Sequence, residues 1–535
     1  MNAVQRLLTD HLDIWTAADT AKKSGRGRSS GNAASVYGIR KLRELIFELA
    51  ALGRLIDEDI HQPAKLVQLG EIAEFVMGQA PPGSECNTNG IGTIFVKTGE
   101  FGSLYPEECE WTTKPLKFAK KGDVLICVVG ATVGKLNLAI DCAIGRSVAA
   151  IRPVTGLDTK YIYFALMPFT LRLRAQSRGS AQGVIGKAEL NAVQIRLPSI
   201  AEQHRIVAKV DELLALCDQL ETRHTNAAEA HEKLVSQLLG TLTLSQSAAD
   251  FSANWQRIAA HFDTLFTTEA SIDALKQTLL QLAVMGKLVP QDPHDEPASE
   301  LLKRIQAEKT RLIAEGKIRK DKLLAAITEE EKLIELPTGW QWVRLDTIAE
   351  IRGGKRVSNG YQLLTQPTPY IYIRVSDMKE GSIDDSDLHY IDSEMREKIS
   401  RYIITKDDIY MTIVGATIGK CGIVPEKFDQ MNLTENAARL TPCEGIEKLF
   451  LYKCLDSSIC QSQFFDKTKQ VGVQKMALNR LASTIIFLPP RAEQIRILAK
   501  LDELMALCDQ LKSRIAAASQ LQQKLAEVMV EQAVA

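Results

Sequence analysis

Two stretches of the chain carry a seam of residues, mostly apolar, at alternating steps of four and three positions. The first runs through Ile206, Val210, Leu213, Cys217, Leu220, His224, Ala227, His231, Leu234 and Leu238. The second runs through Ile497, Leu501, Leu504, Cys508, Leu511, Ile515, Ala518, Gln522, Leu525 and Met529. A sustained seam of this kind predicts two long helices with coiled-coil packing, the first over about residues 201–239.

Two residue types on these seams could also carry chemistry. Cys217 and Cys508 occupy seam positions, where a thiol packs as a small apolar side chain, so we expect buried rather than reactive cysteines. His224 and His231 are seven residues apart on one face and could ligate a metal. Polar contacts between helices are the simpler interpretation, and we expect no metal site.

The chain contains an internal repeat. LPSIAEQHRIVAKVDELLALCDQLETR (197–223) and LPPRAEQIRILAKLDELMALCDQLKSR (488–514) are identical at 19 of 27 positions. Upstream, GKAELN (186–191) matches QKMALN (474–479), and VQLGEIAEF (67–75) matches VRLDTIAEI (343–351). The repeat predicts two versions of one domain, at about 66–197 and 342–490, each followed by one long helix.

A further match makes the repeat circular. LRELIFELAALGRLI (42–56) precedes the first domain and LKQTLLQLAVMGKLV (275–289) precedes the second, while HLD at 11–13 has a counterpart HFD at 261–263. Read as a circle, both halves contain a domain, a long helix and short helices. We therefore expect an internal pseudo-two-fold, in which the C-terminal helix packs on the N-terminal helices as 200–240 packs on 255–290.

The central connector is longer than its N-terminal counterpart. Leu55 and Leu69 are 14 residues apart, whereas Leu288 and Leu345 are 57 apart, a difference of 43 residues. The extra segment contains ASELLKRIQAEKTRLIAEGKIRKDK, whose apolar spacing and basic far end predict a helix with Ser299 as its N-cap.

Each domain also contains an apolar run that ends in a glycine loop, VLICVVGATVGK at 124–135 and IYMTIVGATIGK at 409–420. A phosphate-binding loop needs GxxxxGK, then Ser or Thr, and then a helix. Here the glycines are one residue too close, Leu136 and Cys421 follow the lysines, and a strand-like run follows Lys135. Both loops are predicted to be hairpin turns rather than nucleotide sites.

Other enzyme signatures are missing. The sequence has no GxGxxG, HExxH or GxSxG, and neither Pro-Pro pair is followed by the aromatic residue that a DNA amino-methyltransferase uses to hold its base. Scattered acids could still form a nuclease site, but no pattern singles one out. By elimination, the sequence favours a binding and assembly protein.

Bulk composition narrows the class further. The net charge is -1, so a nucleic-acid surface would require local segregation of charge. The ten cysteines form no CxxC pair, no apolar window is long enough to span a membrane, and the N-terminus lacks a signal-peptide pattern. We expect a cytoplasmic protein with reduced thiols.

Charge is segregated in the first domain. Residues 111–196 contain 13 Lys and Arg against 4 Asp and Glu, a balance of +9, whereas residues 342–490 contain 19 of each sign. Basic groups among Ser, Gly and amide side chains suit contacts with phosphates and base edges. The candidates in the first domain are Arg146, Arg172, Arg174, Arg178, Gln182 and Lys187, and those in the second are Lys355, Arg356, Lys467, Lys469, Gln470, Gln474 and Lys475. Ordinary solvated loops remain the alternative for each.

These features together resemble one family, the specificity (S, HsdS) subunits of type I restriction-modification systems. The resemblance rests on the two copies of LPxxAEQxRIxAKxDEL, the LPTGWQWVRL entry at 336–345 and the GATxGK turn of each half. YGIRKLRELIFELA and GKLVPQDPHDEPASELLKRI are similar to the subfamily with long N-terminal and central conserved regions.

The resemblance implies an α+β fold in which two mixed α/β target-recognition domains are joined by long antiparallel coiled-coil helices. It divides the chain into an N-terminal conserved helical region (1–65), the first recognition domain (66–197), a central conserved helical region with a linker (198–341), the second recognition domain (342–490) and a C-terminal conserved helix (491–535). Each recognition domain would read one half of a bipartite site in double-stranded DNA.

The resemblance also implies partners and a division of labour. Two methyltransferase (M) subunits and restriction (R) subunits would dock on the chain and supply S-adenosylmethionine, ATP and magnesium, while the chain itself would hold no catalytic residue and no cofactor. Because the two half-sites normally differ, residues common to both domains, Lys135 and Lys420, are candidates for scaffold or phosphate contacts rather than base contacts, with plain hairpin lysines as the alternative.

Two alternatives remain open from the sequence alone. A stand-alone enzyme acting on DNA would bind a nucleotide or S-adenosylmethionine as the purified protein. A coiled-coil scaffold without a DNA role would show no DNA binding even with its partners present, which the +9 segment disfavours.

Overall fold

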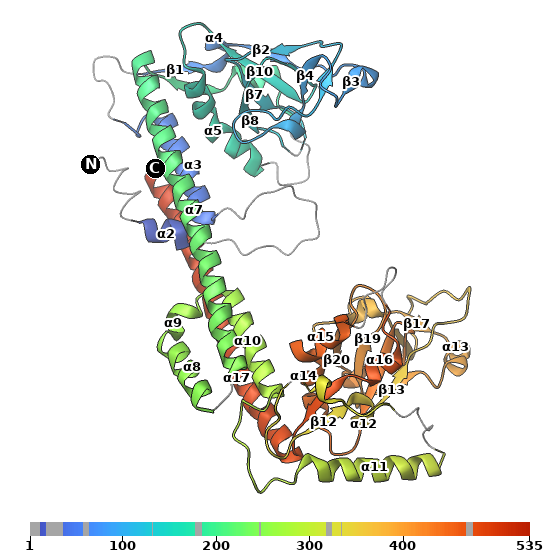
Figure 1. Ribbon diagram of the computed structural model, residues 1–535. Coiled ribbons are helices and arrows are strands. Elements are labelled where there is room, and N and C mark those ends of the chain that lie inside the picture. Colours follow the sequence, from blue (N-terminus) through green and yellow to red (C-terminus); the bar gives the residue numbers. More distant parts are fainter. Residues whose placement is uncertain are drawn as a thin grey trace. The chain divides into compact units, whose positions relative to one another are not determined.

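The computed structural model describes residues 11–17, 36–56, 64–130, 132–176, 184–245, 248–316, 324–332, 334–466 and 475–534 (Figure 1). The chain forms two compact units. Unit 1 comprises residues 1–230 together with 516–535, and unit 2 comprises residues 231–515. Both mix helices with mainly antiparallel sheets, so the predicted α+β class is confirmed.

In the described part of unit 1 the strands form three sheets. β1 pairs with β11, a four-stranded sheet has the order β2-β10-β7-β8, and a five-stranded sheet has the order β3-β5-β4-β9-β6, in which β4 and β9 are parallel. The strands are β1 Lys65–Gln68, β2 Ala73–Met77, β3 Cys86–Asn87, β4 Thr93–Val96, β5 Trp111–Thr112, β6 Phe118–Ala119, β7 Val124–Cys127, β8 Leu136–Leu138, β9 Cys142–Ile144, β10 Val148–Pro153 and β11 Gln194–Leu197.

The helices of unit 1 lie in this domain and along its long helix. They are α2 Leu12–Ala17, α3 Tyr37–Leu52, α4 Leu69–Ile72, α5 Thr159–Gln176, α6 Lys187–Asn191 and the first part of α7 Ile200–Leu244, with short 3-10 turns η1 Gly83–Glu85 and η2 Thr98–Glu100. Figure 1 shows α5 beside the four-stranded sheet and α3 alongside α7. One hydrophobic core joins α3, α5, α7 and the sheet.

Unit 2 repeats this plan with different detail. Among its described residues β12 pairs with β23, one four-stranded sheet has the order β13-β22-β19-β20, another has the order β17-β14-β21-β18, and β15 pairs with β16. The strands are β12 Gln341–Arg344, β13 Ala349–Gly353, β14 Tyr370–Ile373, β15 Met378–Lys379, β16 Ser382–Ile383, β17 Tyr390–Ile391, β18 Ile403–Ile404, β19 Ile409–Thr412, β20 Cys421–Ile423, β21 Met431–Leu433, β22 Ala437–Pro442 and β23 Ile485–Leu488.

The helices of unit 2 include the short elements between the two long helices. They are α8 Ala248–Ala260, α9 Phe262–Leu265, α10 Glu269–Val284, α11 Ala298–Ala314, α12 Leu345–Ile348, α13 Ser393–Lys398, α14 Lys448–Asp456, α15 Ser458–Asp466, α16 Leu478–Ala482 and α17 Arg491–Val534, with 3-10 turns η3 Glu329–Glu331, η4 Val375–Asp377 and η5 Glu426–Phe428. The last residues of α17 belong to unit 1.

The two GATxGK loops are hairpin turns, as predicted. β7 pairs antiparallel with β8, and β19 pairs antiparallel with β20. Gly130 and Gly415 have φ angles of 96° and 98°, a region that favours glycine, and each lysine leads into a strand rather than a helix. A phosphate cradle at the start of a helix is therefore ruled out at these loops.

One sequence match was wrong by three residues. The structure does not pair 186–191 with 474–479; it pairs α6 with α16, so that Lys187–Asn191 corresponds to Leu478–Ala482. The buried side chains agree with this register, because Leu190 and Leu481 are both fully buried. The buried leucine therefore sets the structural register, although Lys, Leu and Asn coincide in the sequence match.

The two long helices are confirmed, but four of the 20 predicted seam positions are exposed. α7 covers 45 residues and α17 covers 44. Ile206 to Cys217 are buried as predicted, whereas Ala227 is exposed, Leu234 is 48% exposed, and Val235 takes the buried position at 2%. In α17, Ala518 and Leu525 are exposed and Ala526 is buried instead.

This shift by one residue has a geometric reason. A straight α-helix drifts by about 20° per heptad relative to a strict seven-residue repeat. Four heptads separate Ile206 from Leu234, so the drift reaches about 80°, close to the roughly 100° between neighbouring residues. The helix segments also change packing partners, from α3 in unit 1 to α8 and α10 in unit 2.

The circular repeat predicted that the C-terminal helix packs on the N-terminal helices, and unit 1 bears this out. Tyr37 of α3 donates a hydrogen bond to Glu527 of α17, and Arg54 donates to the Val534 carbonyl at 3.1 Å. Ala526 is buried in the same core as Leu42 and Leu45.

Equivalent contacts recur in unit 2. Lys287, the counterpart of Arg54, donates to the Thr243 carbonyl at 2.9 Å, and Thr243 is the counterpart of Val534. Likewise the ion pair of Arg43 with Asp218 at 2.8 Å in unit 1 recurs as Lys276 with Asp509 at 2.7 Å. The packing of α7 on 255–290 therefore follows the predicted scheme.

Each long helix begins at a joint that ties it to its neighbouring domain. Gln203 accepts a hydrogen bond from the Asp158 N–H at 3.0 Å, and Gln494 accepts one from the Glu447 N–H at 2.9 Å. The preceding glutamate, Glu202 or Glu493, is 1% exposed in both copies.

The donors to these two glutamates differ. Glu202 accepts from Arg196 at 3.1 Å, and the Arg196 guanidinium fills the space that a side chain at Gly53 would need. Glu493 accepts from the Trp340 ring nitrogen at 3.0 Å, and Trp340 covers the equivalent Gly286. Burial raises the pKa of Glu493 above its ordinary value. The two joints thus share the glutamate, the glutamine and the covered glycine, but not the donor to the glutamate.

Three smaller predictions can be compared directly. Cys217 and Cys508 are buried, and burial raises the pKa of Cys217 to about 11, which confirms packed thiols. His231 lies 3.2 Å from the Thr264 carbonyl, which confirms an interhelical polar contact. Ser299 as an N-cap was wrong, because α11 begins at Ala298 with Pro297 in the capping position.

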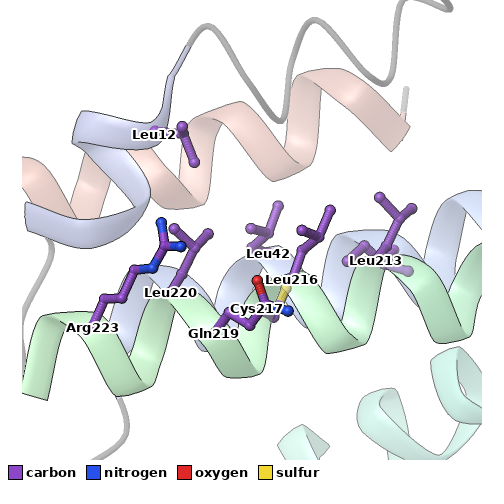
Figure 2. Close-up of a pocket in the computed structure, with 9 residues that line it drawn as sticks. Leu12, Leu42, Leu213, Leu216, Cys217, Gln219, Leu220 and Arg223 are labelled. Carbon is purple, nitrogen blue, oxygen red and sulfur yellow. The ribbon is translucent and has the colours of Figure 1, made fainter.

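An apolar pocket lies between α2, α3 and α7 in unit 1. It has a volume of about 190 Å³ and is lined by Leu12, Leu42, Ile46, Leu213, Leu216, Cys217, Gln219, Leu220 and Arg223 (Figure 2). Leu216 is 47% exposed at its edge, and its counterpart Leu507 in unit 2 is 53% exposed. None of the described helices is both long and apolar enough to cross a membrane.

Candidate nucleic-acid interface

In unit 2, three chain segments meet at one end of the sheet β13-β22-β19-β20. Gly353 at the end of β13 lies opposite Ala438 near the start of β22, and Thr412 at the end of β19 lies opposite Ala437. The loop after β13, the residues before β22 and the GATIGK loop after β19 therefore emerge together. We call residues 353–356, 413–420, 434–436 and 475–476 the unit 2 sheet end.

The fourth segment joins through a backbone contact. Met476 donates its N–H to the Ile413 carbonyl at 2.8 Å, which puts Lys475 beside the GATIGK loop. The sheet end thus gathers Lys355, Arg356, Lys420 and Lys475, all of them exposed. These four predicted residues are far apart in sequence and close in the fold.

Unit 1 has the same arrangement. Met77 of β2 lies opposite Ala149 of β10, Cys127 of β7 lies opposite Val148, and Ile185 donates its N–H to the Val128 carbonyl at 2.9 Å. We call residues 77–80, 128–130, 132–135, 145–147 and 184–187 the unit 1 sheet end. It brings together Lys135, Arg146 and Lys187 of the predicted set.

The three basic residues of the unit 1 sheet end differ in exposure and in their hydrogen bonds. Arg146 and Lys187 are exposed. Lys135 is half-buried, and its ammonium group donates to the Phe101 carbonyl. Lys135 would therefore have to leave a backbone partner to reach a phosphate, so Arg146 and Lys187 are the better placed candidates.

Arg172 lies apart from this group on an exposed position of α5. Burial raises the pKa of Glu48 on α3, and the nearby charge of Arg172 partly offsets that rise. The side chain of Arg174 and the residues Arg178, Gln182, Lys467, Lys469, Gln470 and Gln474 lie outside the described part of the chain.

The +9 balance of residues 111–196 overstates the free positive charge. The ion pair of Arg152 with buried Asp123 at 2.8 Å is already counted in that balance, because both residues lie inside the segment. Lys160 pairs with Asp211 at 2.6 Å and Arg196 pairs with Glu202 at 3.1 Å, and both of these acids lie outside the segment. The surface charge that could meet a polyanion is therefore smaller than the count.

A close backbone approach fixes both sheet ends. A Cβ atom at Gly78 would lie 2.1 Å from the Gly145 carbonyl oxygen, and one at Gly354 would lie 2.1 Å from the Thr434 carbonyl oxygen. Gly78 and Gly354 donate their N–H groups to Val148 and Ala437 at 2.9 and 3.0 Å. The backbone beneath the candidate side chains is thus the same in both copies.

The unit 2 sheet end contains an acid that the sequence reasoning missed. Glu435 pairs with Arg356 at 2.8 Å, and Lys355 lies 5.8 Å from the Tyr402 ring centre. Burial raises the pKa of Glu435, but its own backbone N–H, Arg356 and Thr434 outweigh this, so that the pKa lies below its ordinary value. Glu435 stands two residues before β22, which is the position that Arg146 occupies before β10. Aligning the two copies of the repeat at these strands would have pointed to Glu435.

Metal ligation has no support at these sites. No group of three or more His, Cys, Asp or Glu side chains suited to a metal ion occurs within the described ranges.

Comparison with known proteins identifies the family. A family model described as the type I restriction modification DNA specificity domain matches residues 62–230 and again residues 337–518. The chain is 33% identical to the type I restriction enzyme EcoAI specificity subunit of Escherichia coli, over 99% of this chain and all of that one. The chain belongs to the specificity subunits of type I restriction-modification systems.

A second relative agrees with this assignment, and a solved structure is similar to part of the chain. The type I restriction enzyme EcoEI specificity subunit of Escherichia coli is 33% identical over 99% of this chain and all of its own length. The crystal structure of the HsdS subunit from Thermoanaerobacter tengcongensis is 29% identical, with a TM-score of 0.29, over 39% of this chain and 62% of that chain.

As a specificity subunit, the chain carries the DNA sequence specificity of its system. The two matches of the family model each include one domain and the first part of the helix that follows it. They coincide with the internal repeat, so each copy is a specificity domain in its own right.

Proposed function

We propose that this specificity subunit reads a bipartite site in double-stranded DNA, with residues 66–197 reading one half and residues 342–490 reading the other. The observation that carries the proposal is the pair of sheet ends. Both have the same strand register and the same close glycine approach, yet they present different side chains. One scaffold with two surfaces suits two different half-sites.

The regions outside the readers are proposed to serve assembly. Residues 1–65, 198–341 and 491–535 form the helical regions, whose long antiparallel helices act as a coiled-coil spacer with a pseudo-two-fold. Two methyltransferase (M) subunits and restriction (R) subunits dock there. The recurring contacts of Arg43 with Asp218 and of Lys276 with Asp509 support two equivalent surfaces for two copies of one partner.

The chemistry is proposed to belong to the partners. S-adenosylmethionine, ATP and magnesium bind to the M and R subunits, and this chain supplies only recognition and assembly. The GATxGK hairpins, which lack a helix after the lysine, support a chain without its own nucleotide site.

A salt titration tests the proposed DNA surface. Changing Arg146→Ala together with Lys187→Ala in the complex with M subunits is expected to weaken DNA binding. The slope of log affinity against log salt should fall by about two, because each lost phosphate contact lowers it by roughly one. Fluorescence anisotropy of labelled target DNA at several salt concentrations measures the slope.

The matched control lies on the same sheet. Lys120 and Lys121 are exposed just before β7, at the opposite end of that strand from the GATVGK loop. Lys120→Ala with Lys121→Ala removes the same charge and should leave the slope unchanged. If both pairs lower the slope equally, the effect is one of total charge and the sheet end is not the DNA surface.

A further inference from the structure

The guanidinium group of Arg356 is held at one edge and open at the other. Its Nε donates to Glu435 Oε1 at 2.8 Å, while its two terminal nitrogens have no hydrogen-bond partner among the described residues. The Arg356 side chain is 71% exposed and that of Glu435 is 30% exposed. The two Nη groups therefore face solvent, and the hydrogen bond from Nε to Glu435 constrains their orientation.

Glu435 is itself held in place. Its second carboxylate oxygen accepts from the Thr434 hydroxyl at 3.1 Å. Tyr372 is buried and donates its one hydroxyl proton to the Lys355 carbonyl at 2.8 Å, and its oxygen lies 3.4 Å from the same oxygen of Glu435. The close approach of Gly354 to the Thr434 carbonyl joins the two strands directly beneath this network.

This geometry fits a base edge better than a phosphate. A pair of parallel N–H donors matches the O6 and N7 acceptors of guanine in the major groove. A carboxylate beside the arginine repels phosphate and lowers general affinity, so it is a poor feature for a phosphate contact. An ordinary exposed ion pair contributes little to stability and requires no second layer of hydrogen bonds behind the acid.

The equivalent positions in the described part of unit 1 do not repeat this arrangement. At the unit 1 sheet end, Ala80 stands in the position of Arg356 and Arg146 in that of Glu435. A contact with phosphates would serve both half-sites and could be shared, whereas a base contact has to differ when the half-sites differ. The Arg356–Glu435 pair is therefore specific to the second half-site.

We propose that Arg356, oriented by Glu435, reads a guanine in the half-site of the second recognition domain. Glu435 is a positioning residue in this scheme, and Arg356 makes the contact. The inference rests on the proposed function, because it assumes that residues 342–490 read one block of the target.

Methylation mapping tests the proposal in the complete complex. The full-length chain is expressed with its M subunits, and methylated adenines are mapped by long-read sequencing. Arg356→Ala should make one guanine position of one block degenerate, losing roughly 5- to 150-fold preference there, while every other position is kept. Glu435→Gln should weaken the same position by a smaller factor, because the guanidinium stays but is no longer held by a charge.

Arg491 provides a matched control. It is 56% exposed and its Nε donates to Glu447 Oε1 at 3.1 Å, the same type of pair, at the start of α17. Arg491→Ala should leave both blocks unchanged. Thermal unfolding of each variant checks that the fold is intact.

Three results would overturn the inference. Arg356→Ala could keep every base, it could reduce methylation uniformly at all sites as a phosphate contact would, or the wild-type block could contain no guanine on either strand. A wild-type pattern without two blocks would instead contradict the proposed bipartite reading itself, and the inference with it. The two failures are therefore told apart by the wild-type map.

Discussion

Replacing Gly354 with alanine is expected to destabilise unit 2 by about 3 kcal/mol, at the upper end of the cost of overpacking a rigid site. The added Cβ would lie 2.1 Å from the Thr434 carbonyl oxygen and 2.3 Å from the Leu433 carbonyl oxygen. Both atoms belong to the backbone, so no side-chain rotation can relieve the clash. The strands must separate at the sheet end that carries Arg356 and Glu435.

The neighbouring glycine is the control. A Cβ at Gly353 would lie 3.5 Å from Leu478 Cδ1, which is an ordinary contact, so Gly353→Ala should be close to neutral. Urea or thermal unfolding of the two variants measures the difference. Similar stabilities for both would mean that the close approach at Gly354 is relaxed in solution.

Lengthening both long helices is expected to change the spacing of the recognised sequence. Four residues inserted after Ala228 in α7 and four after Ser519 in α17 add about 6 Å to each helix and rotate the part of the helix beyond the insertion by about 40°. DNA rises about 3.4 Å per base pair. The unread gap between the two blocks should therefore grow by one or two base pairs, while both blocks keep their sequences.

The insertion has to be made in both helices because both of them belong to both units. The division between the units falls at residues 230 and 231 in α7 and at 515 and 516 in α17. Ala228 and Ser519 are equivalent positions of the repeat. An insertion in α7 alone would shift the residues of α7 relative to the residues of α17 that they pack against.

Mapping of methylated adenines measures the gap directly. A four-residue insertion after Gly316, which follows α11 in the central connector, should leave the gap unchanged. A fixed gap in the doubly lengthened variant, or altered blocks, would show that these helices do not set the spacing.

Short-range patterns predicted much of this fold. The run of apolar residues before GATxGK and after it could only become a hairpin, because the glycine spacing excluded the alternative loop and the strand continued beyond the lysine. The long helices were predictable for a similar reason. The spacing of apolar residues within each stretch indicates a helix, whichever elements pack against it.

Contacts between distant segments were harder to predict. The exposure of Leu234 reflects the drift of a straight helix and also the point at which α7 stops packing on α3, and no local pattern contains the second of these. The error at 474–479 arose because matching letters do not reveal which leucine the sheet buries. The backbone bridge from Lys475 to Val414 decides that register.

The basic residues of the candidate site could be predicted from the sequence, but its acidic residue could not be found in the same way. A polyanion surface is expected to be basic, so Lys355 and Arg356 were found and Glu435 was not. The pairing of β13 with β22 puts Glu435 next to Arg356 although 79 residues separate them.

The two joints have a consequence for how such proteins can be shuffled by recombination. Exchanging residues 66–197 with 342–490 would bring Arg196 to the joint that already contains Trp340, which lies just outside the exchanged segment. The other joint would receive Phe487, the counterpart of Arg196, and retain Ala64, the counterpart of Trp340. Glu202 would then be buried without either donor, which is costly for a carboxylate. Crossovers that leave both joints intact must therefore begin upstream of Trp340, and the breakpoints of natural hybrids in this family should lie on that side.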